Sequence, residues 1–521
     1  MKKLSIPIHP ILFAISPVLA LYAFNVSEVS PSEIVAPILI SLGATALLLV
    51  LSWVVFKRLT KPAIAITVFL ALFFSYGHAL TILVGSTLEG RVWILLAVVW
   101  LALLAWGIYS LAKTRRDLSK ASGVLNVVGL ALIFIPMVTI VAHETGATAN
   151  PHETGIGAGA QTLEGGNATA LPDVYYIVPD RYASEDILDE FYSFDNSEFI
   201  DYLKDTGFHV QPDAFSNYPR TPSSLASSLN MSYVNYLTEV VPDDSMDLRP
   251  FYSMIEDNYV CSLLKSQGYT YVHIGPWWEG TRENRFADVS FSYCQLPEFS
   301  MLTLKTTLAY PFCAKAGLLD DERARHRNCA VYAFEKLAEI PEMEEPTFTF
   351  AHILLPHPPF VFDEDGGYVT AQEENERSRE ENYLSQLRYA NSQFKALIDS
   401  ILSQSEVPPI IIIQADEGPL PQGDLRWRAQ GNALHIKYDE ATDDQIRQKM
   451  GILNAYYLPN VDIPASCEPV SPVNTFRLVF NLFFDADLEI LPDRYYAYAE
   501  GYPYRFFEVT DVVVPDTHQQ P

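Results

Sequence analysis

Two acidic residues, Asp416 and Glu417, stand side by side at the end of the apolar run 410–413, which consists of four isoleucines. Such a run, bounded by prolines and by Gly-Pro, predicts a strand buried on both faces, as in the centre of a parallel sheet. A carboxylate pair at the end of a buried strand is costly unless a cation or hydrogen-bond donors receive it. A solvated acidic turn is the alternative interpretation.

A second apolar run, 174–178, is followed by Pro179 and ends in Asp180. In open α/β sheets, ligands bind outside the carboxyl ends of the strands. Because both runs would deliver an acidic residue to this edge, we expect Asp180 and Asp416 to lie close together. Two carboxylates at one sheet edge predict a site for a divalent metal ion.

Thr221 precedes Pro222 and two serines, a pattern typical of a helix start in which Pro222 takes the first position and Thr221 caps it. The free N–H groups and the positive dipole end of such a helix suit a phosphate or sulfate group. An ordinary capped helix is the alternative interpretation. Two further segments carry imidazole, indole and guanidinium groups that would bind a polar, anionic or sugar-like group: His273, Trp277, Arg282 and His357.

The intervening sequence alternates predicted strands with predicted helices. Residues 195–206 have helical spacing and stop at Gly207, and residues 373–402 form a longer amphipathic pattern. Short strands are predicted over 269–273 and from 347 onward. This alternation predicts a mostly parallel central sheet flanked by helices.

Five apolar segments precede this region, and each is long enough to cross about 30 Å of hydrocarbon: 6–24, 34–56, 63–84, 92–111 and 124–141. They contain no Asp, Glu, Lys or Arg, which disfavours a transporter. Basic residues cluster before the first segment and after the second and fourth, whereas the other connections nearly lack them. The positive-inside rule therefore places the N-terminus in the cytoplasm and everything after residue 141 outside.

The charge of the chain is divided between these regions. The first 144 residues carry ten Lys and Arg against five Asp and Glu, whereas the whole chain has a net charge of −28, so the remainder bears −33. Such acidity opposes nucleic-acid binding, which requires basic patches, so no nucleic-acid partner is expected. We expect a transmembrane domain over 1–142, a flexible Gly-, Ala- and Thr-rich tether over 143–170, an α/β domain over 171–492 and an extension over 493–521. The five cysteines all lie after residue 144 and allow one or two disulfides.

Taken together, these motifs resemble a known family. The series Asp180, Asn217, Thr221-Pro-Ser-Ser, His273 to Arg282, Pro-His357-Pro and Asp416 is similar to the membrane-bound sulfatase-like branch of the alkaline phosphatase superfamily. Lipoteichoic-acid synthases and phosphoethanolamine transferases belong to this branch. The resemblance covers about residues 171–492 and implies a five-helix transmembrane bundle followed by an α/β domain of the alkaline phosphatase and sulfatase type.

The resemblance also implies roles for individual residues. Asp180, Thr221 and Asp416 would bind one divalent metal ion, and Thr221 would be the nucleophile, with Ser223 or Ser224 as alternatives. A metal on its oxygen would lower the pKa of the threonine hydroxyl. The ester-binding pocket would be lined by the remaining motif residues: Asn217, His273, Trp277, Arg282 and His357.

Glu417 is a departure, because the family usually has Asp-His where this chain has Asp-Glu. As a metal ligand, Glu417 would favour Mn²⁺, Mg²⁺ or Ca²⁺ over Zn²⁺. The sequence thus predicts a multi-pass protein of the cell membrane that transfers or hydrolyses phosphate or sulfate esters of envelope lipids or glycans. A catalytically inactive binding or scaffold protein with the same fold is the alternative.

Overall fold

The structure is a computed structural model. It describes residues 6–57, 59–84, 91–146, 171–293, 296–423, 426–428, 434–461, 463, 470–499 and 501–514. The chain divides into two compact units. The first comprises Met1–Ala147 together with Leu296–Asp321, and the second comprises Thr148–Gln295 and Glu322–Pro521.

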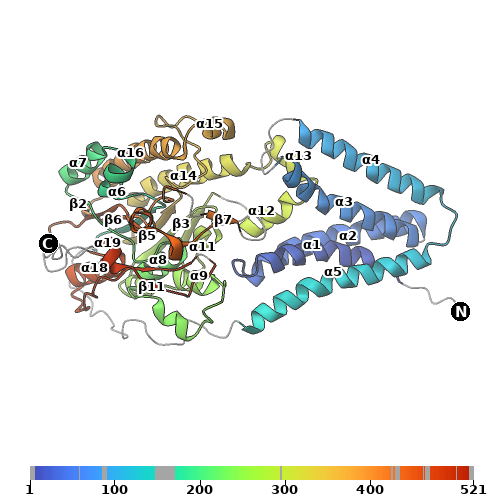
Figure 1. Cartoon of the computed structure of the whole chain (residues 1–521), viewed down its shortest axis with the longest axis horizontal. Helices are drawn as coiled ribbons and strands as arrows, with labels where there is room; N and C mark the ends of the chain where they lie inside the picture. The colour runs from blue at the N-terminus through green and yellow to red at the C-terminus, as the bar shows by residue number, and fades with distance from the viewer. Residues whose placement is uncertain are drawn as a thin grey trace. The chain divides into compact units, whose positions relative to one another are not determined.

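The first unit is helical (Figure 1). Its elements are α1 (His9–Phe24), η1 (Pro31–Ile34), α2 (Val35–Phe56), α3 (Thr60–Val84), α4 (Val92–Lys113), α5 (Ser119–Gly146), α12 (Glu298–Lys305) and α13 (Tyr310–Lys315). In the described part of the chain, α2, α3, α4 and α5 are long and apolar enough to cross a membrane. The 16 residues of α1 measure about 24 Å, shorter than the hydrocarbon core, so the expected five spans are four long helices and one shorter one. α1 packs against α2, α3 and α5.

The second unit is built on a seven-stranded sheet with the strand order β2-β9-β6-β1-β5-β3-β4. The bounds are β1 (Val174–Pro179), β2 (His209–Gln211), β3 (Thr270–Gly275), β4 (Val289–Ser292), β5 (Thr347–Ile353), β6 (Ile410–Gln414) and β9 (Asn454–Tyr457). β6, β1, β5, β3 and β4 are parallel, and β9 and β2 add an antiparallel edge. The sheet is therefore mixed and mostly parallel.

The two central strands, β1 and β6, are apolar at nearly every position because both of their faces are buried. Side chains of a strand alternate between the faces of the sheet, and here both faces are buried. Ile411 and Ile413 of β6 belong to one hydrophobic core, and Ile410 and Ile412 belong to the other. Each fully buried isoleucine contributes about 1.5–3 kcal/mol, so both faces stabilise the strand that carries Asp416.

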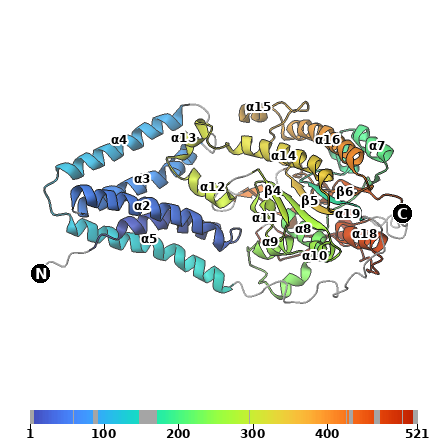
Figure 2. The same ribbon diagram turned by 180° about the vertical axis from the view of Figure 1, so that it is seen from behind.

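Helices cover the two faces of the sheet (Figure 2). α6 (Glu185–Tyr192), α7 (Ser197–Thr206), α14 (Glu322–Glu339) and α16 (Arg379–Gln404) contribute to one core. α8 (Thr221–Asn230), α9 (Arg249–Glu256), α10 (Tyr259–Ser266) and α18 (Thr475–Phe483) contribute to the other. The remaining described helices of six or more residues are α15 (Ala371–Glu376) and α17 (Asp443–Met450).

Two helix predictions can be compared with these bounds. α7 ends at Gly207, as predicted, with the left-handed φ of 101° that favours glycine. The helix predicted over 373–402 is instead two helices, α15 and α16. Ser378 accepts from the backbone N–H of Glu381 in a capping box that starts the second helix.

Several predictions concern residues that the structure describes only in part. Residues 143–146 complete α5, and the rest of the predicted tether lies outside the described residues. Cys294 and Cys467 also lie outside them, so the disulfides stay a prediction. In the predicted extension, Tyr495, Ala497, Val509 and Val513 form a small hydrophobic core with Phe215 and Tyr438 of the second unit.

Candidate active site

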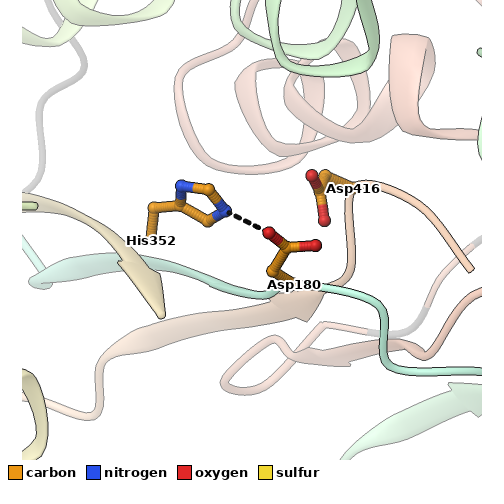
Figure 3. Close-up of side chains that lie close together, drawn as sticks. All are labelled: Asp180, His352 and Asp416. Carbon is orange, nitrogen blue, oxygen red and sulfur yellow. Dashed lines mark ion pairs between the residues drawn. The ribbon is translucent and has the colours of Figure 1, made fainter. Parts of the chain in front are cut away.

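Three buried side chains meet at the carboxyl edge of the sheet: Asp180, His352 and Asp416 (Figure 3). One potential ligand atom of each lies within 4.8 Å of those of the other two. His352 Nε2 is 3.6 Å from Asp180 Oδ2. All three residues are at most 3% exposed. This geometry is that of a small polar cluster enclosed in an apolar domain.

The strand register produces the cluster. Asp180 directly follows β1, and Asp416 lies two residues beyond the end of β6. Val178 of β1 is paired with His352 of β5, and Ile177 of β1 is paired with Ile413 of β6. Three adjacent parallel strands therefore deliver one side chain each to the same edge, which is where ligands bind in sheets of this type.

Most polar atoms of this cluster form no hydrogen bond with the described residues. Among the described residues, Asp180 Oδ1, both carboxylate oxygens of Asp416 and His352 Nε2 are buried without a hydrogen bond. An unpaired buried polar atom costs about 1–3 kcal/mol, and more if it is charged. Two carboxylates and an imidazole are also common ligands of divalent metals. The cluster therefore fits a metal cation.

The electrostatics agree with this fit. Burial raises the pKa of Asp180, but the nearby His357, His352 and Arg181 outweigh burial and hold the pKa below its usual range. The pKa of Asp416 is raised well above its usual value, first by burial and then by the charges of Asp180 and Glu417. Without a cation, Asp416 therefore favours its protonated form.

His352 is held in place from behind. Thr281 Oγ1 lies 2.7 Å from His352 Nδ1, and the Thr281 carbonyl lies 2.8 Å from His273 Nε2. If Nδ1 donates to Thr281, Nε2 presents its lone pair to the two carboxylates, as in many metal sites. Burial lowers the pKa of His273 to about 4, so this histidine is neutral at pH 7. His273, predicted to line the pocket, therefore supports the Thr281 loop behind His352.

Thr221 begins α8, with Arg220 as the N-cap residue, and no side-chain cap is present there. The prediction that Thr221 caps this helix is wrong, because Thr221 is itself the first helical residue. Its hydroxyl instead lies close enough to Asp416 to lower the pKa of that carboxyl against the effect of burial. The alternative nucleophiles Ser223 and Ser224 are fully buried, and Ser223 Oγ bonds to the Arg220 carbonyl and the Tyr498 hydroxyl.

Glu417 has a different environment from Asp416. Its Oε1 accepts from Arg181 Nε at 2.8 Å and from Lys449 Nζ at 2.7 Å. The Lys449 side chain is 1% exposed and also donates to the Gly418 carbonyl. Burial raises the pKa of Glu417, but the charges of Lys449 and Arg181 lower it by more than burial raises it. The pKa is therefore below its usual value. Glu417 is thus the counterion of two cations and is absent from the three-residue cluster.

His357 lies close enough to Asp180, Arg181 and Glu417 to interact with their charges. Its Nδ1 donates to the Pro358 carbonyl, so the neutral ring has its lone pair on Nε2. Burial, aided by Arg181, lowers the pKa of His357 to about 4.

Trp277 is connected to His357 through a third histidine. Trp277 Nε1 donates to His326 Nδ1 at 3.0 Å, and His326 Nε2 donates to the His357 carbonyl at 3.1 Å. His326 is 1% exposed. Trp277 thus supports the backbone that carries His357.

Two predicted pocket residues bond elsewhere. The Arg282 guanidinium is buried and pairs with Glu279, on the same short helix, and with Glu283, the residue that follows it. Asn217 donates to the Arg494 carbonyl and accepts from the Val473 N–H. Neither residue belongs to the three-residue cluster of Asp180, His352 and Asp416.

A hollow lies beside Arg181. It holds about 300 Å³ including space open to solvent, and its lining includes Arg181, Arg379, Tyr192, Tyr383, Phe360 and Pro419. The hydrogen bond from Arg181 Nε fixes the guanidinium, whereas its Nη groups bond to no described residue. The hollow thus combines an anchored cation with aromatic walls.

Sequence reasoning missed His352, Arg181 and Lys449. His352 could have been found, because it lies in the strand that precedes His357 and that strand was predicted. Arg181 directly follows Asp180 and has a left-handed φ of 66°, a conformation that is uncommon outside glycine and that clusters at functional sites. Lys449 carries no local signal.

Comparison with known proteins gives three findings. Residues 176–453, more than half of the chain, match the family described as Sulfatase. No curated protein matches. Among solved structures, the C-terminal periplasmic domain of EptC from Escherichia coli, in complex with zinc, is similar at 11% identity, with 66% of this chain and 93% of that chain covered and a TM-score of 0.42.

Two further structures are similar. For the C-terminal periplasmic domain of the phosphoethanolamine transferase EptC from Campylobacter jejuni, the identity is 13%, the coverage is 56% of this chain and 80% of that chain, and the TM-score is 0.35. The putative sulfatase YidJ from Bacteroides fragilis is 14% identical, with 64% of this chain and 83% of that chain covered and a TM-score of 0.38. The family match includes Asp180, His352 and Asp416, and the chain belongs to the sulfatase family.

Proposed function

We propose that this protein is a membrane-bound, metal-dependent enzyme that transfers or hydrolyses phosphate or sulfate esters, with Thr221 as the nucleophile. The observation that carries this proposal is the buried cluster of Asp180, His352 and Asp416. Most of its ligand atoms form no hydrogen bond with the described residues, and it lies close to the Thr221 hydroxyl. Membership in the sulfatase family supports ester chemistry at this edge of the sheet.

Asp180, Asp416 and His352 would hold one divalent metal ion, with the Thr221 oxygen as a further ligand. The metal would lower the pKa of the hydroxyl and polarise the ester oxygens. The imidazole changes the expected metal preference. Because Glu417 is paired with two cations and His352 offers nitrogen, Zn²⁺ and Mn²⁺ suit the donor set as well as Mg²⁺ does.

The chemical step can be written for the residues of this chain. The Thr221 oxygen forms a bond to phosphorus or sulfur as the bond to the leaving oxygen breaks. The hydroxyl proton is released to solvent, and the leaving oxygen takes up one proton. Water or an acceptor hydroxyl then attacks the phosphorus or sulfur, and the bond to the Thr221 oxygen breaks. The Thr221 oxygen takes up a proton, and the attacking oxygen loses one. His357, neutral with a free Nε2, is suited to receive that proton.

Substrate binding is assigned to Arg181 and the hollow beside it. The fixed guanidinium can bind two oxygens of an anionic ester at once. The rings of Tyr192, Tyr383 and Phe360 would contact the body of the substrate. The apolar helices of the first unit favour an envelope lipid or a lipid-linked glycan as substrate and membrane lipids as surroundings, with the N-terminus in the cytoplasm and the sulfatase domain outside.

The second candidate is an inactive binding or scaffold protein, which Glu417 favours because it replaces the usual histidine. The position of His352 favours the enzyme, since it provides an imidazole from the neighbouring strand. Metal content separates the two candidates. Protein purified without chelator should contain about one divalent metal ion per chain if the enzyme is correct and none if the scaffold is correct.

Activity provides the direct test. Purified full-length protein is incubated with bis(p-nitrophenyl) phosphate and p-nitrophenyl sulfate, each with Mn²⁺, Mg²⁺ or Zn²⁺. We expect Thr221→Ala to reduce the rate by about 10⁴-fold, as loss of a nucleophile does elsewhere. Ser223→Ala is the matched control, since Ser223 lies on the same helix. A metal-dependent rate that survives Thr221→Ala and is lost in Ser223→Ala would assign the nucleophile to the serine.

A further inference from the structure

One segment of the sulfatase region packs with the membrane helices. Leu296–Asp321 lies within the matched residues 176–453, yet it belongs to the first compact unit. It contains α12 and α13. In both views of the fold these helices lie beside α1, α3 and α4 (Figures 1 and 2).

The contact begins with the backbone. Gly77 of α3 donates its N–H to the Thr306 carbonyl at 2.8 Å, and Leu308 donates its N–H to the Phe73 carbonyl at 2.9 Å. Phe73 and Gly77 are four residues apart, so these are the two groups that bond to each other in a regular α-helix. The turn between α12 and α13 is thus hydrogen-bonded to the backbone of an apolar helix on both its donor and its acceptor side.

Gly77 allows this approach. A Cβ atom at this position would lie 2.0 Å from the Lys305 carbonyl oxygen and 2.6 Å from Thr306 Cα. Both atoms belong to the backbone, so a side-chain rotation cannot relieve the overlap. Any other residue at position 77 would push the turn away from α3.

Side chains extend the contact from the segment to three helices, α1, α3 and α4. Phe299 of α12 packs with Val18 and Tyr22 of α1. Met301 and Tyr310 are buried in one cluster with Tyr76 and Leu80 of α3 and Leu96 of α4.

The contact lies on one side of the first unit. α12 contacts η1, which connects α1 to α2, and Phe312 of α13 meets the Trp93 ring at the start of α4. Because the helices alternate in direction, the ends of α1, α3 and α5 lie on the same side. Ile140, near the end of α5, packs against the same cluster as Phe299, so the segment lies on the side of the first unit where α5 ends.

The depth of the contact follows from helix geometry. Gly77 precedes the last residue of α3 by seven residues, or about 10 Å of helix. The hydrocarbon core is about 30 Å thick, so the turn reaches its outer third. Backbone polar groups at that depth must be satisfied by protein, and the two hydrogen bonds to α3 do so. Two apolar side chains of the segment remain largely exposed: Phe312, which meets the Trp93 ring, is 47% exposed, and Leu318 is 73% exposed.

We propose that Leu296–Asp321 is a re-entrant helical pair that anchors the sulfatase domain to the membrane by itself, independently of the connection after α5. Its partners are α1, α3 and α4 and the surrounding acyl chains of the outer leaflet. The sulfatase domain is thus attached at two places in the sequence. This inference does not depend on the proposed enzymatic activity.

The test uses the full chain with a protease site inserted between residues 155 and 160. Membranes are treated with the protease, washed with alkaline carbonate to remove peripheral proteins, and sedimented. We expect at least 80% of the C-terminal fragment to remain in the pellet, although its covalent link to α5 is cut. Release of the wild-type fragment into the supernatant would overturn the proposal.

Two variants test the docking itself. Gly77→Leu should release most of the cut fragment, whereas Gly43→Leu should not, because no atom lies within 4 Å of a Cβ placed at Gly43 of α2. Phe299→Asp changes the segment and leaves the spans intact, and it should also release the fragment. Each uncut variant must elute as wild type in detergent, which identifies a misfolded span. If both Gly77→Leu and Phe299→Asp retain the fragment, the proposed docking is wrong.

Discussion

The role of Glu417 can be tested by its effect on stability in the absence of metal. Glu417→Gln removes the charge that compensates Lys449 and Arg181, whose side chains are 1% and 18% exposed. Breaking a buried ion pair by removing one partner costs about 3–5 kcal/mol. The second unit has roughly 350 residues, so its unfolding entropy is about 0.7 kcal/mol/K. We therefore expect the apparent Tm of the chelator-treated protein to fall by about 4–7 °C.

A metal ligand would behave in the opposite way. The charge of Glu417 raises the pKa of the neighbouring Asp416, so in a cluster of unpaired carboxylates its removal would stabilise the metal-free protein. The measurement is intrinsic fluorescence during heating in detergent with excess chelator. An unchanged or higher Tm for Glu417→Gln would refute the counterion assignment.

A double-mutant cycle and a pH series sharpen the test. Lys449→Met leaves Glu417 with only Arg181. The double variant should be more stable, by about 0.5–3 kcal/mol, than the sum of the two single destabilisations predicts.

The pKa of Glu417 is lowered from its usual value of 4.5, so its charge stabilises the fold at pH values above 4.5. This stabilisation is lost as the pH falls through the lower value of the folded state. The difference between wild type and Glu417→Gln should therefore shrink on acidification below pH 4.

Three further outcomes follow from the geometry. Mn²⁺ or Zn²⁺ at 100 times its Kd should stabilise the chelator-treated protein by about 2.7 kcal/mol, or roughly 4 °C. The gain should be larger at pH 8 than at pH 6, because Asp416, whose pKa is raised, must release its proton to bind the cation. Thr281→Val removes the hydroxyl that bonds to His352 Nδ1 and should weaken metal binding, measured by titration calorimetry, by about 10–100-fold. Ile412→Ala should lower stability by about 2–5 kcal/mol in thermal unfolding, and a metal affinity close to wild type is expected because this side chain lies in the core.

The sequence predicted the parts of the site that depend on local patterns. The apolar runs before Asp180 and Asp416 specify buried parallel strands, and the rule for sheet edges brings their ends together. The start of α8 near Thr221 also has a local signal, Pro222, although the helix begins one residue earlier than predicted.

Other parts depend on contacts distant in sequence. Glu417 looks like a second metal ligand as long as Lys449, 32 residues later, is not known to lie beside it. Arg282 and Asn217 have suitable side chains, but local acids and backbone groups satisfy them. The segment Leu296–Asp321 has the composition of an ordinary pair of amphipathic helices, and only packing reveals that their apolar faces contact α1, α3 and α4.

The close approach at Gly77 has a practical consequence for producing the catalytic region alone. A secreted fragment that starts at residue 171 would carry Phe299, Met301 and Tyr310 without the helices that bury them. Exposed apolar patches of this kind promote aggregation. Such a fragment should be recovered as a monodisperse protein only after the segment Leu296–Asp321 is replaced by a short polar linker.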